Sequence, residues 1–197
     1  MKTRGLLASL LLAGVLLGCQ KSPPPAPAFQ ATDITGAAFA RDFELTDHNG
    51  RTRRLADFRG KVVAIFFGYT HCPDVCPTTL SDFAIALKSM GDDANRVQVL
   101  FVTVDPERDT PELLKQFVPA FNPNFLGMST DAQHLKALTQ EYKVVYQKTS
   151  ERGPGDYLID HSAGTYIYDP QGRLRLLMPY GSGADVIAHD LKALLAL

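Results

Sequence analysis

Residues 61–90 constrain the fold of this chain more than any other stretch. A continuous run of β-branched and aromatic residues, KVVAIFFGYT, occupies 61–70 and is typical of a strand buried on both faces of a sheet. It leads directly into CPDVCPTTLSDFAIALKSM, whose apolar residues recur at helical spacing. We therefore expect a buried strand that turns at once into a helix, with Cys72 and Cys76 at the junction.

The rest of the chain alternates strands and helices around this unit. An Asn-Gly turn predicts a β-hairpin within 42–60, and the run RVQVLFVTVD predicts a second buried strand at 96–105. Helices are expected at 109–121, 130–144 and 183–197, and a second hairpin over 165–180. This order predicts an α/β fold of thioredoxin-like type, with helices on both faces of a mixed central sheet and an N-terminal β-hairpin.

An export signal is expected to precede the folded domain. Lys2 and Arg4 stand before an apolar run at 5–18, which is too short for a comfortable membrane span and is typical of a signal peptide. The ending LLGC resembles a bacterial lipoprotein processing box, which implies cleavage before Cys19 and lipidation of its sulfur. The alternative is an ordinary secretory signal in which this cysteine is incidental.

A proline-rich stretch separates Cys19 from the domain. The sequence KSPPPAPAF cannot form a helix or an inner strand, and it suits a semi-rigid, extended tether. We therefore predict a signal peptide at 1–18, a lipid-anchored tether at 19–40 and a thioredoxin-like domain at 41–197. This organisation places the protein in the bacterial cell envelope, held to a membrane by lipid, with the domain outside the cytoplasm on the periplasmic side.

Composition limits what the domain can bind. Lys and Arg total 20 and Asp and Glu total 21, so nothing resembles the basic surface of a nucleic-acid-binding protein. Once Cys19 is set aside, Cys72 and Cys76 are two thiols in an exported domain, where conditions permit disulfides. The pair could be a metal clamp, a redox-active dithiol or a structural disulfide. A disulfide that closes so short a loop stabilises little, so the structural role is least favoured.

The spacing of the two cysteines favours a soft-metal site. If this stretch is helical, Cys72 and Cys76 lie one turn apart and about 40° apart around the axis, so both sulfurs face the same way. The helix N-terminus stabilises thiolates and is expected to make Cys72 the more reactive thiol. Thiolates select Cu(I), zinc or iron–sulfur clusters. Zinc asks for four ligands and no second cysteine pair exists, whereas copper needs one more donor.

The chain has five histidines that could supply this donor. His161 is the best candidate, because it lies in the loop before the strand expected at 165–169, and in thioredoxin-like folds this loop faces the cysteine turn. A polar loop histidine without a ligand role is the alternative. The others are expected to lie in a solvated turn, to point away from the cysteines or to be exposed on helices: His48, His71, His134 and His189.

The domain resembles the Sco/SenC family of copper proteins, which serve cytochrome c oxidase assembly. The resemblance runs over about residues 40–195 and rests on DFELTDHNG, FFGYTHCPDVCPTTL, VTVDPERDTPELL, FLGMST and DHSAGTYIYDPQG, in that order. It implies that Cys72, Cys76 and His161 bind one copper ion per domain, as Cu(I), Cu(II) or both. It also implies a thioredoxin-like fold and delivery of copper to the copper-bearing subunit of the oxidase.

An enzymatic alternative stays open beside the carrier. The protein could be a copper chaperone without catalytic residues, or a thiol–disulfide oxidoreductase or peroxiredoxin-like reductase that uses Cys72 and Cys76. The CxxxC spacing differs from the CxxC of thioredoxins, and the DHSAGT loop has no proline, so the carrier is favoured. Other copper chaperones or thioredoxin-like reductases would be its further partners.

Four charged residues in these motifs have less specific roles. Asp74 lies between the cysteines and Asp160 lies beside His161, so either could orient a ligand from outside the donor set. Glu107 and Arg108 belong to the DPERD run and are expected to be turn residues with solvated charges.

Overall fold

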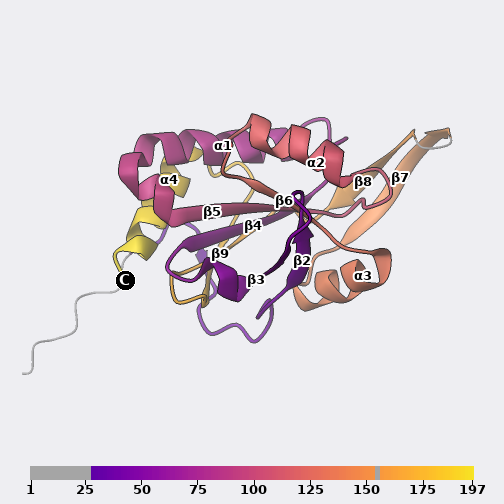
Figure 1. Ribbon diagram of the computed structural model, residues 1–197. Coiled ribbons are helices and arrows are strands. Elements are labelled where there is room, and N and C mark those ends of the chain that lie inside the picture. The colour runs from indigo at the N-terminus through magenta and orange to yellow at the C-terminus, as the bar shows by residue number, and fades with distance from the viewer. Residues whose placement is uncertain (1–27, 154–155) are drawn as a thin grey trace, which may run out of the picture.

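An eight-stranded mixed sheet forms the centre of the molecule (Figure 1). The computed structural model describes residues 28–153 and 156–197. Across the sheet the strands follow the order β1-β10-β9-β4-β5-β6-β2-β3. Their bounds are Thr32–Asp33 (β1), Glu44–Asp47 (β2), Thr52–Arg54 (β3), Val62–Gly68 (β4), Val97–Thr103 (β5), Leu126–Ser129 (β6), Thr165–Tyr168 (β9) and Leu174–Met178 (β10).

Strand β4 lies in the middle of this sheet and leads into the cysteine turn. It pairs in parallel with β5 and antiparallel with β9, so that Phe66 lies opposite both Phe101 and Thr165. Every residue of β4 and β5 is buried, as their unbroken apolar runs predict. The mixed sheet expected from the order of elements is confirmed.

Helices cover both faces of the sheet. Figure 1 shows α1 (Val75–Met90) and α2 (Pro111–Phe117) on one face and α3 (Ala132–Glu141) on the other, while α4 (Ala184–Leu195) packs beside α1. Short 3-10 helices occupy Leu55–Phe58, Gly91–Arg96 and Val118–Ala120. The apolar face predicted for α1 is buried at Leu80, Phe83, Leu87 and Met90. The thioredoxin-like arrangement expected from the sequence is therefore present.

Side-chain caps begin two of the helices. The Thr110 hydroxyl accepts a hydrogen bond from the Leu113 N–H at the start of α2, where Pro111 occupies the first position. The Asp131 carboxylate accepts hydrogen bonds from two backbone N–H groups at the start of α3. Both caps satisfy amide groups that have no partner within the helix.

Both predicted hairpins are present. The first joins β2 to β3, and Gly50 in its turn has a φ of 79°, which explains the glycine at this position. The second joins β9 to β10.

A third hairpin, which carries His161, is not predicted by the sequence analysis. Strands β7 (Tyr146–Gly153) and β8 (Asp156–His161) form a separate two-stranded sheet. Figure 1 shows it projecting on the side of the molecule away from α4. The sequence of β7, YQKTSERG, lacks an apolar alternation that would reveal a strand. His161 is thus the last residue of a strand and not part of a loop.

Residues shortly before β2 pack against the domain. The N–H groups of Gln30 and Ala31 donate hydrogen bonds to the buried carboxylate of Asp190 on α4, and β1 pairs with β10. Residues 28–40, which the sequence assigns to the tether, therefore pack against the domain, with Ala31 and Ala40 buried. The predicted signal peptide and Cys19 lie outside the described residues. Within the described part, no helix combines the length and the apolar character that crossing a membrane requires.

Candidate metal centre

The junction between β4 and α1 brings the Cys76 sulfur against the sheet. Cys76 lies in the first turn of α1 and is fully buried. Gly68, the last residue of β4, makes this approach possible, because a Cβ at this position would lie 2.8 Å from the Cys76 Sγ and 2.8 Å from the Phe101 ring. The glycine is therefore needed for close packing of the helix start on the strand.

Cys72 lies in the turn that precedes α1. Its backbone N–H donates to the Tyr69 carbonyl at 3.3 Å, and its Sγ accepts the backbone N–H of Cys76 at 3.4 Å. Its side chain is half-buried, whereas that of Cys76 is fully enclosed. The two cysteines are thus not both helical, because α1 begins at Val75. The sulfurs nevertheless face the same site.

His161 completes the cluster from the end of β8. Its Nε2 lies 3.4 Å from the Cys76 Sγ, and its Nδ1 lies 3.0 Å from the Ser162 carbonyl. An Nδ1–H that donates to this carbonyl leaves the Nε2 lone pair directed at the cysteines. The imidazole packs edge-on against the rings of Phe66 and Tyr69. The ring is therefore held in one orientation by contacts on several sides.

The three side chains form a compact donor set. Their ligand atoms, two sulfurs and one imidazole nitrogen, all lie within 4.8 Å of one another. Both cysteines are free thiols. Two soft sulfur donors with one imidazole suit copper, and among the described residues the group contains no fourth donor of the kind that a structural zinc site requires. The structure thus brings together the three residues that the sequence predicted as ligands.

The two thiols have opposite electrostatic environments. A hydrogen bond from the Cys76 thiol is the main cause that lowers the pKa of Cys72 to about 4; burial opposes it, and the N–H groups of Asp74 and Cys76 add to it. The same hydrogen bond and burial raise the pKa of Cys76 above its ordinary value. Cys72 is therefore the thiolate, as predicted, although the partner thiol contributes more to this than the helix N-terminus.

The remaining histidines lie outside the cluster. His134 and His189 are exposed, as predicted, and each ring contacts an aspartate next to it in space, Asp131 and Asp190. His71 is exposed, its ring lies beside Thr70, and it is not a member of the donor group.

The expectation of a solvated His48 is wrong. This side chain is buried, and its Nδ1 accepts the backbone N–H of Gly127 at 3.0 Å. The partner lies on β6, 79 positions further along the chain, so the Asn-Gly turn signal beside His48 gave no indication of it.

The charged residues near the motifs differ in their surroundings. Asp74 precedes α1, and its carboxylate accepts a hydrogen bond from the Thr78 hydroxyl at 3.3 Å. Asp160 is exposed beside His161. Glu107 is exposed and pairs with Lys148, as expected for a solvated charge. Arg108 is not solvated: its side chain is only 16% exposed and contacts Asp105.

Tyr69 is a residue of the site that the sequence analysis missed. Its buried hydroxyl accepts the backbone N–H of Ile159 on β8 at 3.1 Å, and its ring contacts His161. A tyrosine at the end of a buried apolar strand, immediately before the cysteine turn, was the available signal, because a buried hydroxyl requires a partner.

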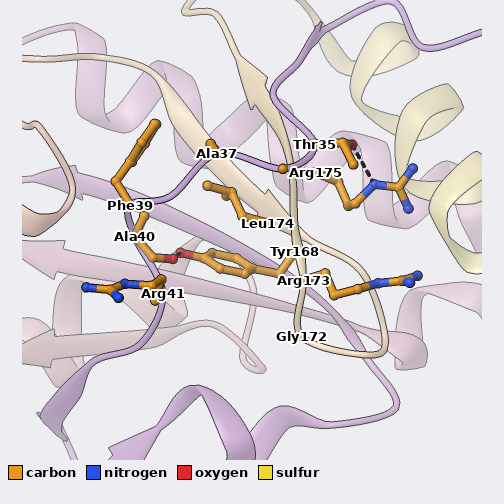
Figure 2. Close-up of a pocket in the computed structure, with 11 residues that line it drawn as sticks. Thr35, Ala37, Phe39, Ala40, Arg41, Tyr168, Gly172, Arg173, Leu174 and Arg175 are labelled. Carbon is orange, nitrogen blue, oxygen red and sulfur yellow. Dashed lines mark hydrogen bonds between the residues drawn. The ribbon is translucent and has the colours of Figure 1, made fainter.

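Two cavities lie at opposite ends of the central strands. A cavity of about 310 Å³ adjoins the donor set and is lined by Tyr69, Cys72, Pro73, Asp74, Val75, Leu158, Ile159, Asp160 and His161. A larger cavity, of about 590 Å³, lies beside Tyr168 (Figure 2). Tyr168 pairs with Val63 at the start of β4, far from the cysteine turn. Figure 2 shows the guanidinium groups of Arg41 and Arg173 pointing in opposite directions, so they do not converge on one ligand.

Comparisons with known proteins identify relatives of the chain. The family model described as SCO1/SenC matches residues 31–196. The mitochondrial SCO2 homolog of Bos taurus is 40% identical over 133 residues, which cover 66% of this chain and 50% of that protein. The chain therefore spans about half the length of this relative.

Solved structures with the same fold include copper-bound and copper-free proteins. ScoI of Bradyrhizobium japonicum with copper bound has a TM-score of 0.72 and 40% identity, covering 79% of this chain and 98% of that one. Apo Sco1 of Thermus thermophilus has a TM-score of 0.75 and 42% identity, covering 85% of this chain and 97% of that one.

Proposed function

Because this chain belongs to the SCO1/SenC family, we propose that it binds one copper ion through Cys72, Cys76 and His161 and delivers it for assembly of the copper centre of cytochrome c oxidase. The observation that carries the proposal is the convergence of these donors. His161 lies 85 positions beyond Cys76, yet its Nε2 lies 3.4 Å from that sulfur. The copper-bound ScoI structure supports the choice of metal.

The surroundings of the donors suit a carrier that takes up and gives away its ion. Cys72 is a half-buried thiolate that an incoming cation can reach through the 310 Å³ cavity. Cys76 is buried and protonated in the metal-free protein, so its proton must leave when it becomes a ligand. A copper ion must displace this proton in order to bind, so its affinity falls at low pH and its release is favoured under acidic conditions.

We infer that the carrier works at a membrane outside the cytoplasm. Support comes from the sequence, in which the apolar run at 5–18 ends in a lipoprotein-type cysteine, Cys19. Residues between Cys19 and β1 would then link the anchor to the domain. The copper-bearing subunit of the oxidase is the proposed recipient, and other copper chaperones or thioredoxin-like reductases are proposed as partners that load copper or reduce the thiols.

A thiol–disulfide oxidoreductase is the second candidate function, and one observation favours it. The reactive thiolate of Cys72 is accessible, and the protonated thiol of Cys76 lies behind it. An accessible thiolate beside a buried thiol is the arrangement of an attacking and a resolving cysteine. Because the same two thiols must be reduced to bind Cu(I), the two functions would exclude each other in any one molecule at a given moment.

Two assays on the same reduced protein distinguish these functions. Anaerobic titration with Cu(I) and Cu(II) measures binding, and incubation of the loaded protein with the metal-free copper domain of the oxidase subunit measures transfer. Reduction of insulin disulfides measures oxidoreductase activity. The carrier is supported by one copper bound per chain, transfer to the subunit and negligible insulin reduction. Insulin reduction without copper transfer would establish the oxidoreductase instead.

A further inference from the structure

We propose that Asp105, Arg108 and Tyr157 form a clasp that positions His161 against the two cysteines. The inference deepens the proposed function, because it names residues that control the copper site without contacting it. It assigns a role to Arg108, which the sequence analysis expected to be a solvated turn residue. The three residues come from the loop after β5 and from β8.

The hairpin that carries His161 needs additional contacts to fix its position, because it lies outside the main sheet. Among the described residues, strands β7 and β8 pair with no other strand and form a separate two-stranded sheet. The main sheet therefore does not fix their position through a strand ladder. The chain links His161 to β9 through residues 162–164, which fixes one end of β8. A second point of attachment, away from this end, is required to fix the direction of β8.

The clasp supplies this second attachment at Tyr157. The Arg108 guanidinium lies over the Tyr157 ring, with its Cζ 3.6 Å from the ring centroid, and Nη1 donates to the Tyr157 carbonyl at 2.9 Å. Arg108 Nε donates to the Asp105 carboxylate at 2.5 Å, and the Tyr157 hydroxyl donates to the same carboxylate at 2.7 Å. Asp105 is 1% exposed and Tyr157 is 7% exposed. Buried, charge-assisted contacts of this kind restrict geometry more strongly than exposed pairs do.

The same loop also holds the cysteine turn. The buried Asp109 carboxylate accepts the backbone N–H of Thr70 at 3.0 Å and the Thr70 hydroxyl at 2.6 Å. It also accepts the Thr103 hydroxyl at the end of β5 at 2.6 Å. Thr70 lies two residues before Cys72. The loop at 105–109 therefore contacts both the turn that carries the cysteines and the strand that carries His161.

The alternation of β8 transmits the position of Tyr157 to His161. Tyr157, Ile159 and His161 point to the same face of the strand, because side chains alternate along it. Tyr157 is held by the clasp, the Ile159 N–H is held by the Tyr69 hydroxyl, and His161 faces Cys76. Release of Tyr157 would therefore let the strand pivot and carry the imidazole away from the sulfurs.

A neighbouring ion pair provides a matched control. Glu107, in the same loop, pairs with Lys148 on β7 at 2.7 Å and also accepts the Tyr157 hydroxyl at 3.5 Å, but the side chains of Glu107 and Lys148 are 69% and 44% exposed. Exposed pairs contribute little, and a glutamine oxygen can still accept the Tyr157 hydroxyl, so Glu107→Gln should leave the hairpin and the donor set unchanged.

The first part of the test needs no metal. Hydrogen exchange of backbone amides is measured in the reduced apo protein for the wild type, Arg108→Gln, Tyr157→Phe and Glu107→Gln. The clasp predicts that Arg108→Gln and Tyr157→Phe speed exchange in β8 by about tenfold or more while β4 and β5 keep their rates, as expected for local opening. Unchanged β8 exchange in both variants overturns the proposal. Equal acceleration in β4 and β5 also overturns it, because the residues would then support only global stability.

The second part measures copper affinity in a double-mutant cycle. Arg108→Gln should weaken Cu(II) binding by about tenfold, a loss typical for residues that orient metal ligands. In the His161→Ala background the same substitution should change affinity less than about twofold, because it acts through the missing ring. A tenfold loss that persists without His161 contradicts positioning. Failure of the wild type to bind copper would refute the proposed function, while the exchange experiment would still decide on the clasp.

Discussion

At the scale of single residues, two cysteines of the same motif have acquired different chemical states. The side chain of Cys72 is half-buried, receives hydrogen bonds from the Cys76 thiol and nearby N–H groups, and is therefore a thiolate. Cys76 is enclosed by β4 and α1 and keeps its proton. Only one sulfur is thus prepared for an incoming electrophile or metal ion, and the other becomes available after it gives up a proton.

Alkylation against pH tests this difference. The pKa of Cys72 is lowered to about 4, so its thiolate is formed above that pH and lost below it. Its reaction with iodoacetamide should therefore be nearly constant between about pH 5 and pH 8, where an ordinary thiol would accelerate about tenfold per unit. Cys76 should stay unmodified in the folded, metal-free protein. Peptide mass spectrometry separates the two sites, and a steep rise for Cys72 between pH 6 and pH 8 would contradict the assigned thiolate.

At the scale of elements, some parts of the site follow from sequence and others do not. The strand β4, the helix α1 and the cysteines between them are predictable, because local apolar patterns and motif spacing determine them. The hairpin β7–β8 is not, because β7 has a polar sequence and the hairpin owes its position to contacts that other elements make with β8. His161 could therefore be identified as a ligand by its motif, while its place at a strand end could not.

The same distinction explains His48 and Arg108. The burial of His48 depends on Gly127, 79 positions away, and that of Arg108 depends on Tyr157, 49 positions away. No local pattern around either residue reports such a partner. Polar and charged side chains are usually exposed, so the sequence predicted solvent for both.

Packing between β4 and α1 gives a prediction for Gly68. In Gly68→Ala the added methyl would lie 2.8 Å from both the Cys76 sulfur and the Phe101 ring, which are buried. We expect the free energy of unfolding to fall by about 1–3 kcal/mol, as for other overpacked cores, and copper affinity to fall with it. Denaturant unfolding measures the first effect.

Gly164→Ala is the matched control for this substitution. Its added methyl would also meet an atom at 2.8 Å, but that atom is the end of the half-buried Leu177 side chain, which can move. It should therefore destabilise the protein less. An equal or larger loss in the control would show that the close approach of Cys76 is not what requires glycine at position 68.

At the scale of the whole molecule, the first described residues and the donor set lie in different places. Gln30 is bound to Asp190 on α4, and Figure 1 shows α4 on the side away from the β7–β8 hairpin. Because these residues join the domain on the α4 side, the hairpin and the cavity beside the donor set stay open to a partner. This arrangement agrees with the proposed carrier, which must present its ion while anchored.

The proposed anchor predicts the behaviour of Cys19→Ser. Without the sulfur no lipid can be attached, so the protein should leave the membrane fraction, or the precursor should stay uncleaved. Fractionation of cells followed by immunoblotting measures both the location and the size of the protein. The Cys72→Ser variant is the control and should fractionate like the wild type. Normal processing and unchanged membrane association of Cys19→Ser would exclude lipidation at this residue.

The most direct test of the central claim is copper binding by His161→Ala. Reduced wild-type protein, His161→Ala and the exposed control His134→Ala would compete for copper against a chelator of known affinity, with circular dichroism to confirm folding. We predict that His161→Ala loses at least about tenfold in Cu(II) affinity and less in Cu(I) affinity, because imidazole suits Cu(II) and two thiolates alone can hold Cu(I). His134→Ala should bind like the wild type. If His161→Ala instead binds both copper states as tightly as the wild type, the site is not a Cys-Cys-His copper site and the carrier mechanism is wrong.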